Sequence, residues 1–118
     1  MILYRPVGPA ELELIRSSAF RRFPPRLPDQ PIFYPVLNFN YAEQIARDWN
    51  SKTSANDFQG YVTRFSIDDT YGSKFEVQIV GAAHHQELWV PAEELEIFND
   101  HILGEIDLVA SYRQGQRT

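Results

Sequence analysis

Two histidines, a carboxylate and an indole follow closely on one another in residues 84–89, which read His-His-Gln-Glu-Leu-Trp. Successive side chains of a β-strand point to opposite sides of its sheet, so a strand here that buries Leu88 places Glu87 and Trp89 together on its other face. His85, two residues before Glu87, falls on the same side. A carboxylate beside an aromatic ring occurs both on solvated strands and in catalytic clefts. Glu87 is therefore the first candidate for a functional residue.

Arg5 and Tyr34, each in an apolar segment of its own, complete a set that suits a phosphorylated ligand with a flat, cationic ring. A guanidinium binds phosphate or ribose oxygens through two parallel hydrogen bonds, and a tyrosine ring stacks on a flat ring. A carboxylate such as Glu87 stabilises an oxocarbenium-like transition state, as in glycoside cleavage. Spacing alone favours a structural explanation for each residue: a surface ion pair for Arg5, a core ring for Tyr34 and a solvated strand face for Glu87.

Other catalytic chemistries find less support in the sequence. The chain has three histidines and no cysteine. His84 and His85 would point to opposite faces of a strand, so no metal site is expected. The G-x-S-x-G motif of a nucleophile elbow is absent. The pair Asp68 and Asp69 is expected to stabilise a turn rather than to bind a cation.

Composition narrows the range of partners. The net charge of -5 argues against non-specific binding to nucleic acid, which needs clustered lysines and arginines, although a nucleic acid stays open as an acceptor. Arg21, Arg22 and Arg26 form a local exception that could contact a small phosphorylated ligand. The lack of cysteine suits a reducing cytoplasm. No signal peptide or long apolar segment is recognised, so no membrane partner is expected.

The hydrophobic pattern predicts six strands, over residues 2–5, 32–37, 61–67, 75–79, 86–90 and 106–112. Three helices are predicted, which begin at Pro9, after Asn40 and at Pro91. Strands and helices neither alternate strictly nor form separate halves, and no G-x-G-x-x-G or P-loop motif is present. The sequence therefore predicts one mixed α+β domain over residues 1–118, with residues 113–118 as a frayed polar tail.

Several local features follow from the same pattern. Asn40 is the predicted N-cap of the second helix, with Glu43 completing a capping box. The apolar stripe of that helix consists of Ala42, Ile45, Ala46 and Trp49. The third helix is expected to end at Gly104, and Val77 and Ile79 are expected to face the core from a half-buried strand.

Three short motifs and their order in the chain suggest a family. LYRPVG at residues 3–8 precedes a helix, IFYPVLN at 32–38 leads into YAEQIA at 41–46, and ELWVP at 87–91 precedes a closing strand. In this order they resemble a minimal ADP-ribosyltransferase-like domain. They are most similar to small bacterial proteins of the ADP-ribosylation/crystallin J1 family. The resemblance covers nearly the whole chain and implies a split, strongly bent mixed sheet with NAD in the cleft between its halves.

The resemblance also implies roles for the candidate residues. In that superfamily the first strand carries an Arg or His that holds NAD, the second a Ser, Thr or Tyr beside the nicotinamide, and a later strand the catalytic Glu. These positions fall on Arg5, Tyr34 and Glu87. The implied reaction is cleavage of the nicotinamide–ribose bond, with NAD as substrate and no metal. ADP-ribose passes to an unknown macromolecular acceptor or to water.

Further contacts are expected around these three residues. Tyr4 beside Arg5 is a candidate NAD contact, Trp89 a wall of the pocket, and Arg22 and Arg26 phosphate contacts. His85 occupies the position where many transferases that act on side chains carry Gln or Glu, so it is a candidate for orienting the acceptor or acting as a base.

A second departure from the family pattern is Tyr34-Pro35, where arginine-specific members show a Ser-Thr-Ser-like run. Two alternatives to the enzyme remain. One is a non-catalytic module that binds a nucleotide or a protein on the same fold. The other is an unrelated α+β interaction domain in which Glu87 is a surface residue.

Overall fold

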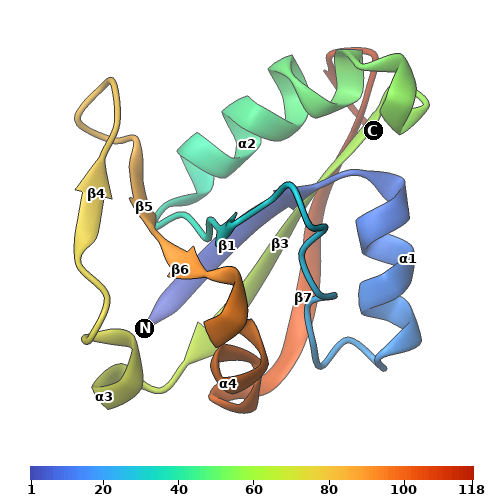
Figure 1. Cartoon of the computed structure of the whole chain (residues 1–118). Coiled ribbons are helices and arrows are strands. Elements are labelled where there is room, and N and C mark those ends of the chain that lie inside the picture. The colour runs from blue at the N-terminus through green and yellow to red at the C-terminus, as the bar shows by residue number, and fades with distance from the viewer.

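The central element of the computed structural model, which describes all of residues 1–118, is an antiparallel sheet with strand order β1-β3-β7-β8 (Figure 1). The strands are β1 (Ile2–Val7), β3 (Gln59–Ile67), β7 (Ile102–Arg113) and β8 (Gln116–Arg117). The register between β3 and β7 shifts after Val62 and again after Arg64. Such irregularities increase local twist and bend a sheet. The result is a mixed α+β fold around a curled sheet.

Two smaller strand pairs adjoin this sheet: β4 (Val77–Ile79) with β5 (Gln86–Leu88), and β2 (Ile32–Phe33) with β6 (Val90–Pro91). Val36 links them to β1, because it forms a single bridge to Tyr4 on one side and to Glu87 on the other. The segment around Val36 therefore fixes Glu87 relative to the edge of the main sheet. All strand pairings are antiparallel, so the expectation of a mixed sheet is wrong.

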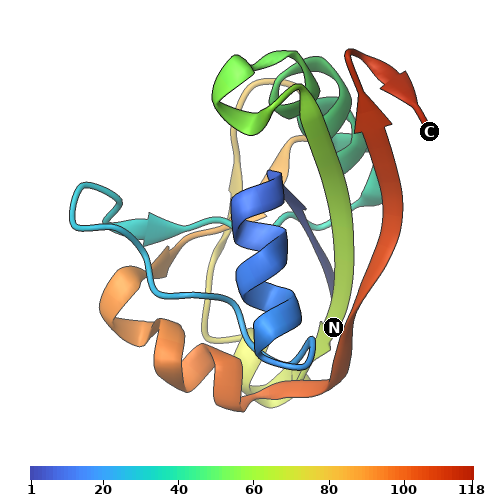
Figure 2. The ribbon, with the colours of Figure 1, turned by 90° about the vertical axis from the view of Figure 1, so that its right-hand side faces the viewer.

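The helices cover both faces of the main sheet. They are α1 (Pro9–Ser17), α2 (Phe39–Asp48), α3 (Asp69–Gly72) and α4 (Leu95–Asp100), with short 3-10 turns at Asn50–Lys52, Ser54–Asn56 and Ala92–Glu94. On one face α1 and α4 enclose the larger core (Figure 2). On the other, Ala42 and Ala46 of α2 pack against Val62 and Ala110. None of these helices has the length and apolar character to cross a membrane.

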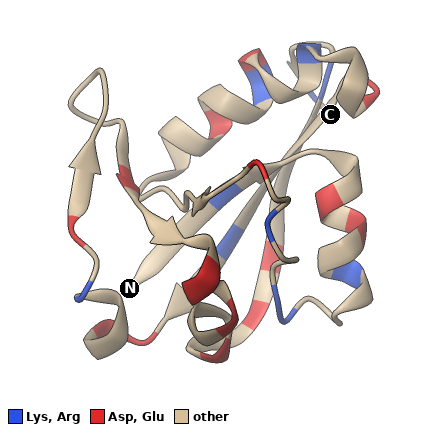
Figure 3. Cartoon of the chain, in the orientation of Figure 1, with Lys and Arg blue, Asp and Glu red and all other residues tan.

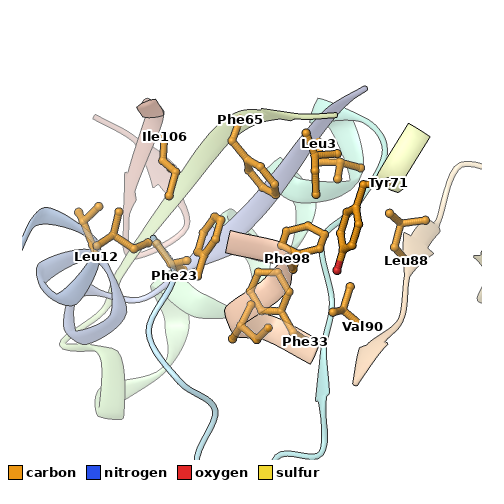
Figure 4. Packing of buried hydrophobic residues seen from close by; sticks show 14 residues of the cluster. Leu3, Leu12, Phe23, Phe33, Phe65, Tyr71, Leu88, Val90, Phe98 and Ile106 are labelled. Atoms are coloured by element: carbon orange, nitrogen blue, oxygen red, sulfur yellow. The ribbon is translucent and has the colours of Figure 1, made fainter. Parts of the chain in front are cut away.

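Aromatic rings fill the larger core (Figure 4). The ring of Phe23 lies 4.9 Å from that of Phe65 and 5.1 Å from that of Phe33, measured between centroids. Leu88 and Val90 are fully buried in the same cluster. The expected inward direction of Leu88 and Val90 is thus confirmed, and it turns the side chain of Glu87 away from this core.

The start of α2 differs from the prediction. Asn38, not Asn40, is the N-cap, and its Oδ1 accepts a 2.8 Å hydrogen bond from the backbone N–H of Tyr41. Helix α2 therefore begins before the predicted position. Trp49 of the predicted apolar stripe lies beyond the helix and is 73% exposed.

The other corrections concern the second half of the chain. Pro91 belongs to β6 rather than to a helix, and α4 ends at Asp100. Gly104, expected to end that helix, lies in β7 with φ +74°. Val77 and Ile79 are exposed, because β4 pairs only with β5 and contributes no residue to either core cluster. The expected tail contains β8, which pairs back on β7.

Candidate functional site

A cavity of about 560 Å³ lies beside β1, between α2 and the part of the chain that carries Glu87 and Trp89. Arg5, Tyr34, Glu87 and Trp89 all line it. Arg5, Tyr34 and Glu87, which are far apart in the sequence, thus line one concave surface. The volume falls within the range of about 300–1,000 Å³ that is usual for pockets that bind small molecules.

Glu87 is only 9% exposed. It is therefore not a surface residue, as the alternative of an unrelated interaction domain required. Its Oε2 accepts a 2.9 Å hydrogen bond from the hydroxyl of Tyr41, and its Oε1 accepts a 2.8 Å bond from the indole N–H of Trp89. Both donors are neutral groups. The carboxylate is thus held in a fixed orientation without an ion pair that would cancel its charge.

Tyr41 is a site residue that the sequence analysis missed. Its backbone is placed by the Asn38 cap at the start of α2. Burial, followed by the hydrogen bond to Glu87, raises the pKa of the Tyr41 hydroxyl to about 12, so this hydroxyl remains a donor at neutral pH. Tyr41, Ile45 and Trp49 recur every four residues and all line the cavity. The spacing of Tyr41 from Ile45 and Trp49 of the predicted apolar stripe was the available signal.

The histidine pair contacts α2 rather than the cavity. The ring of His85 stacks on that of Tyr41, with centroids 4.4 Å apart and an interplanar angle of 18°. The Nε2 atoms of His84 and His85 lie 3.4 and 3.1 Å from Oε1 of Gln44. The two side chains therefore do not point to opposite faces, because this part of the chain is a turn and not a strand. His85 supports Tyr41 and reaches Glu87 only through it.

Arg5 is 9% exposed and already has a partner. Its Nε and Nη2 atoms donate to the two carboxylate oxygens of Glu11 at 2.6 and 2.9 Å. Its guanidinium also lies over the ring of Phe33, 4.7 Å from the centroid. The sequence analysis did not anticipate this role for Glu11, which reaches β1 from the first turn of α1.

The aromatic wall of the cavity is partly open to solvent. Tyr34 and Trp89 are 40% and 44% exposed, and their rings meet edge to face at 6.4 Å. Tyr4 points elsewhere, since its ring packs on Phe39 at 6.1 Å and does not line the cavity. Two exposed rings at the rim leave a flat face accessible to a planar ligand group.

The two predicted phosphate contacts fall outside this cavity. Arg22 binds Asp100 at 2.8 Å and Glu96 at 3.4 Å, which ties the loop after α1 to α4. The side-chain hydrogen bond to Asp100 is the main cause that raises the pKa of Arg22. Arg26 lines a neighbouring cavity together with Arg5. No group of three or more His, Asp or Glu residues is placed to hold a metal ion.

No family model, curated protein or solved structure matches this chain. The likeness to ADP-ribosyltransferases stays a prediction from short motifs, and any function has to be argued from the side chains of the cavity.

Proposed function

We propose that the cavity binds NAD and that Glu87 promotes cleavage of the nicotinamide–ribose bond. The observation that carries this proposal is the nearly buried carboxylate, held by Tyr41 and Trp89 in a cavity that also contains Arg5. In the reaction the bond between the nicotinamide nitrogen and ribose C1′ breaks, and its electron pair leaves with nicotinamide. A nucleophile of a macromolecule, or water, then bonds to C1′ and loses a proton.

Electrostatics support a role for Glu87 in that step. Positive charge develops on the ribose as the bond breaks, and a fixed negative charge beside it lowers the energy of the transition state. The uncharged donors Tyr41 and Trp89 orient the carboxylate but leave its charge in place. Glu87 can also accept a hydrogen bond from a ribose hydroxyl, as carboxylates do in glycoside hydrolysis.

The other walls suit the remainder of NAD. Tyr34 and Trp89 present aromatic rings to the cavity, with Trp49 on the α2 side. Such rings stack on a flat, electron-poor ring like nicotinamide. Arg5 stands at the boundary of the cavity, where its guanidinium would contact ribose or phosphate oxygens.

The test is release of nicotinamide from NAD by the purified chain. Glu87→Gln keeps the shape and removes the charge, so turnover should fall by about 100-fold or more. Glu105→Gln, an exposed glutamate on β7, is the matched control and should leave the rate unchanged. Undiminished release by Glu87→Gln would remove Glu87 from the mechanism.

One observation favours the non-catalytic alternative. Arg5 is already bound in two places by Glu11, as in a structural ion pair. A module that only binds a nucleotide or a protein partner would need neither a free Arg5 nor turnover. Calorimetric binding of NAD with no release of nicotinamide would identify such a module. Absence of both would exclude NAD as the ligand.

A further inference from the structure

A second cavity of about 480 Å³ lies on the other side of Arg5. Arg5, Pro6 and Asn50 line both cavities, so the two are direct neighbours. The walls of the second cavity come from the start of α1 and from the proline-rich loop that follows this helix. Figure 3 shows basic residues along this loop and acidic residues on α1 and around α4.

Charge in this wall is not balanced. The charge of Arg5 is paired with Glu11. Arg26 has no carboxylate bound to it, and its Nε donates at 3.0 Å to the backbone oxygen of Ile32. Two guanidiniums and one carboxylate therefore leave one positive charge facing the cavity. Burial lowers the pKa of Arg26, with a further contribution from Arg5, but arginine stays charged in proteins.

Neutral hydrogen-bonding groups complete the wall. Gln30, Asn50 and Asn56, which carry side-chain amides, are among its lining residues. Asn50 lies in the part shared by both cavities. The first turn of α1, which has no side-chain cap, adds partial positive charge beside these groups.

We propose that the second cavity binds a phosphate group, with Arg26 as its main cationic contact. Guanidinium groups bind phosphate through two hydrogen bonds at once, and the unbalanced positive charge favours an anion there. Since the two cavities meet at Arg5, one ligand can fill both, with its ring and ribose beside Glu87 and its diphosphate beside Arg26. This joining of the cavities rests on the proposed function, whereas the phosphate site does not.

The test measures binding of inorganic pyrophosphate, NAD and nicotinamide by calorimetry. Arg26→Gln should weaken the binding of pyrophosphate and of NAD by about tenfold or more and leave the affinity for nicotinamide unchanged. Arg26→Lys keeps the charge but loses the two-point contact, so it should retain intermediate affinity. Arg21→Gln, in the same loop but exposed, is the control and should bind like the unaltered chain. Thermal unfolding of each variant shows whether it is folded.

A change of less than about twofold in Arg26→Gln, or an equal loss in Arg21→Gln, would overturn the phosphate site. Competition between pyrophosphate and NAD supports one ligand across both cavities, whereas simultaneous binding overturns that joining and indicates a separate phosphorylated ligand. The outcomes also separate this inference from the proposed function. If pyrophosphate binding depends on Arg26 but no nicotinamide is released, the phosphate site is supported and the proposed NAD cleavage is not. If Arg26→Gln leaves NAD affinity and turnover unchanged, the proposed enzyme activity is retained and the phosphate site is not part of it.

Discussion

The hydroxyl of Tyr41 donates a 2.9 Å hydrogen bond to Oε2 of Glu87, joining the first turn of α2 to strand β5. With the bond from Trp89 to the other oxygen, it fixes both carboxylate oxygens in the cavity. The contact brings together two residues that are 46 positions apart in the sequence. It makes Tyr41 a positioning group for the proposed chemistry.

Tyr41→Phe should lower the rate of nicotinamide release by about tenfold with little change in KM, because it removes a group that orients Glu87 rather than one that binds NAD. The lost bond to a nearly buried carboxylate should also reduce the free energy of unfolding by roughly 1–3 kcal/mol. Steady-state kinetics and urea unfolding measure the two effects. Tyr61→Phe, which removes a local bond to Gln59, is the control. Equal behaviour of the two variants would contradict the assignment.

Alkaline pH should destabilise the chain through the same hydroxyl. The pKa of Tyr41 is raised from 10.0 to about 12 in the folded state, so the unfolded chain loses this proton first. The stability that Tyr41 contributes is therefore present below about pH 10 and is lost as pH rises toward about 12. The pKa of Tyr112 is raised to about 12 as well, first by burial and then by the hydrogen bond of its hydroxyl to Glu43. Urea unfolding across this window should show a shallower fall in Tyr41→Phe than in the unaltered chain.

The ion pair of Arg5 and Glu11 should contribute more to stability than the exposed pair of Arg16 and Glu13. Glu11→Gln leaves a nearly buried guanidinium without its partner, which costs roughly 3 kcal/mol. Glu13→Gln breaks a solvated pair and should cost less than about 1 kcal/mol. Denaturant unfolding distinguishes the two. Similar losses would show that the bidentate contact does not anchor α1 to β1.

Asn38→Ala should destabilise the chain by about 1 kcal/mol or more, because the N-cap of α2 is lost. Asn38 also donates from Nδ2 to the backbone oxygen of His84 at 2.6 Å, so the substitution loosens the histidine turn as well. Asn40→Ala, at the exposed position predicted from the sequence, should have little effect. Thermal unfolding of both variants decides which asparagine caps the helix.

The sequence predicted much of the fold where a local pattern decides it. The alternation around Glu87 correctly placed Leu88 in the core and Trp89 beside the carboxylate, because the period of a strand fixes these directions. The presence of β1 and β3 was also predicted correctly. The mixed α+β class followed from the order of the elements.

The remaining parts depended on contacts between distant residues. Asn38 and Asn40 both fit the pattern of a cap, and only the docking of Asn38 against the turn at His84 distinguishes them. Tyr41 lies outside the predicted apolar stripe, and only the hydrogen bond from its hydroxyl to Glu87 shows its role. Glu11 lies in the first turn of α1, where the helix dipole alone explains an acidic residue. Its role as the partner of Arg5 depends on a contact between α1 and β1 that no local pattern predicts.

The bridge at Val36 has a consequence for how this chain tolerates change. Residues 35–37 bond to both neighbours through the backbone alone, from Val36 to Tyr4 and from Pro35 and Leu37 to β5. A one-residue shift in such a segment would reverse which side chains face each side of the sheet. A conservative replacement at one of these positions keeps every one of those bonds, but a deletion of one residue moves Tyr34 away from Trp89. The register that holds Tyr34 beside Trp89 thus depends on the number of residues in this segment.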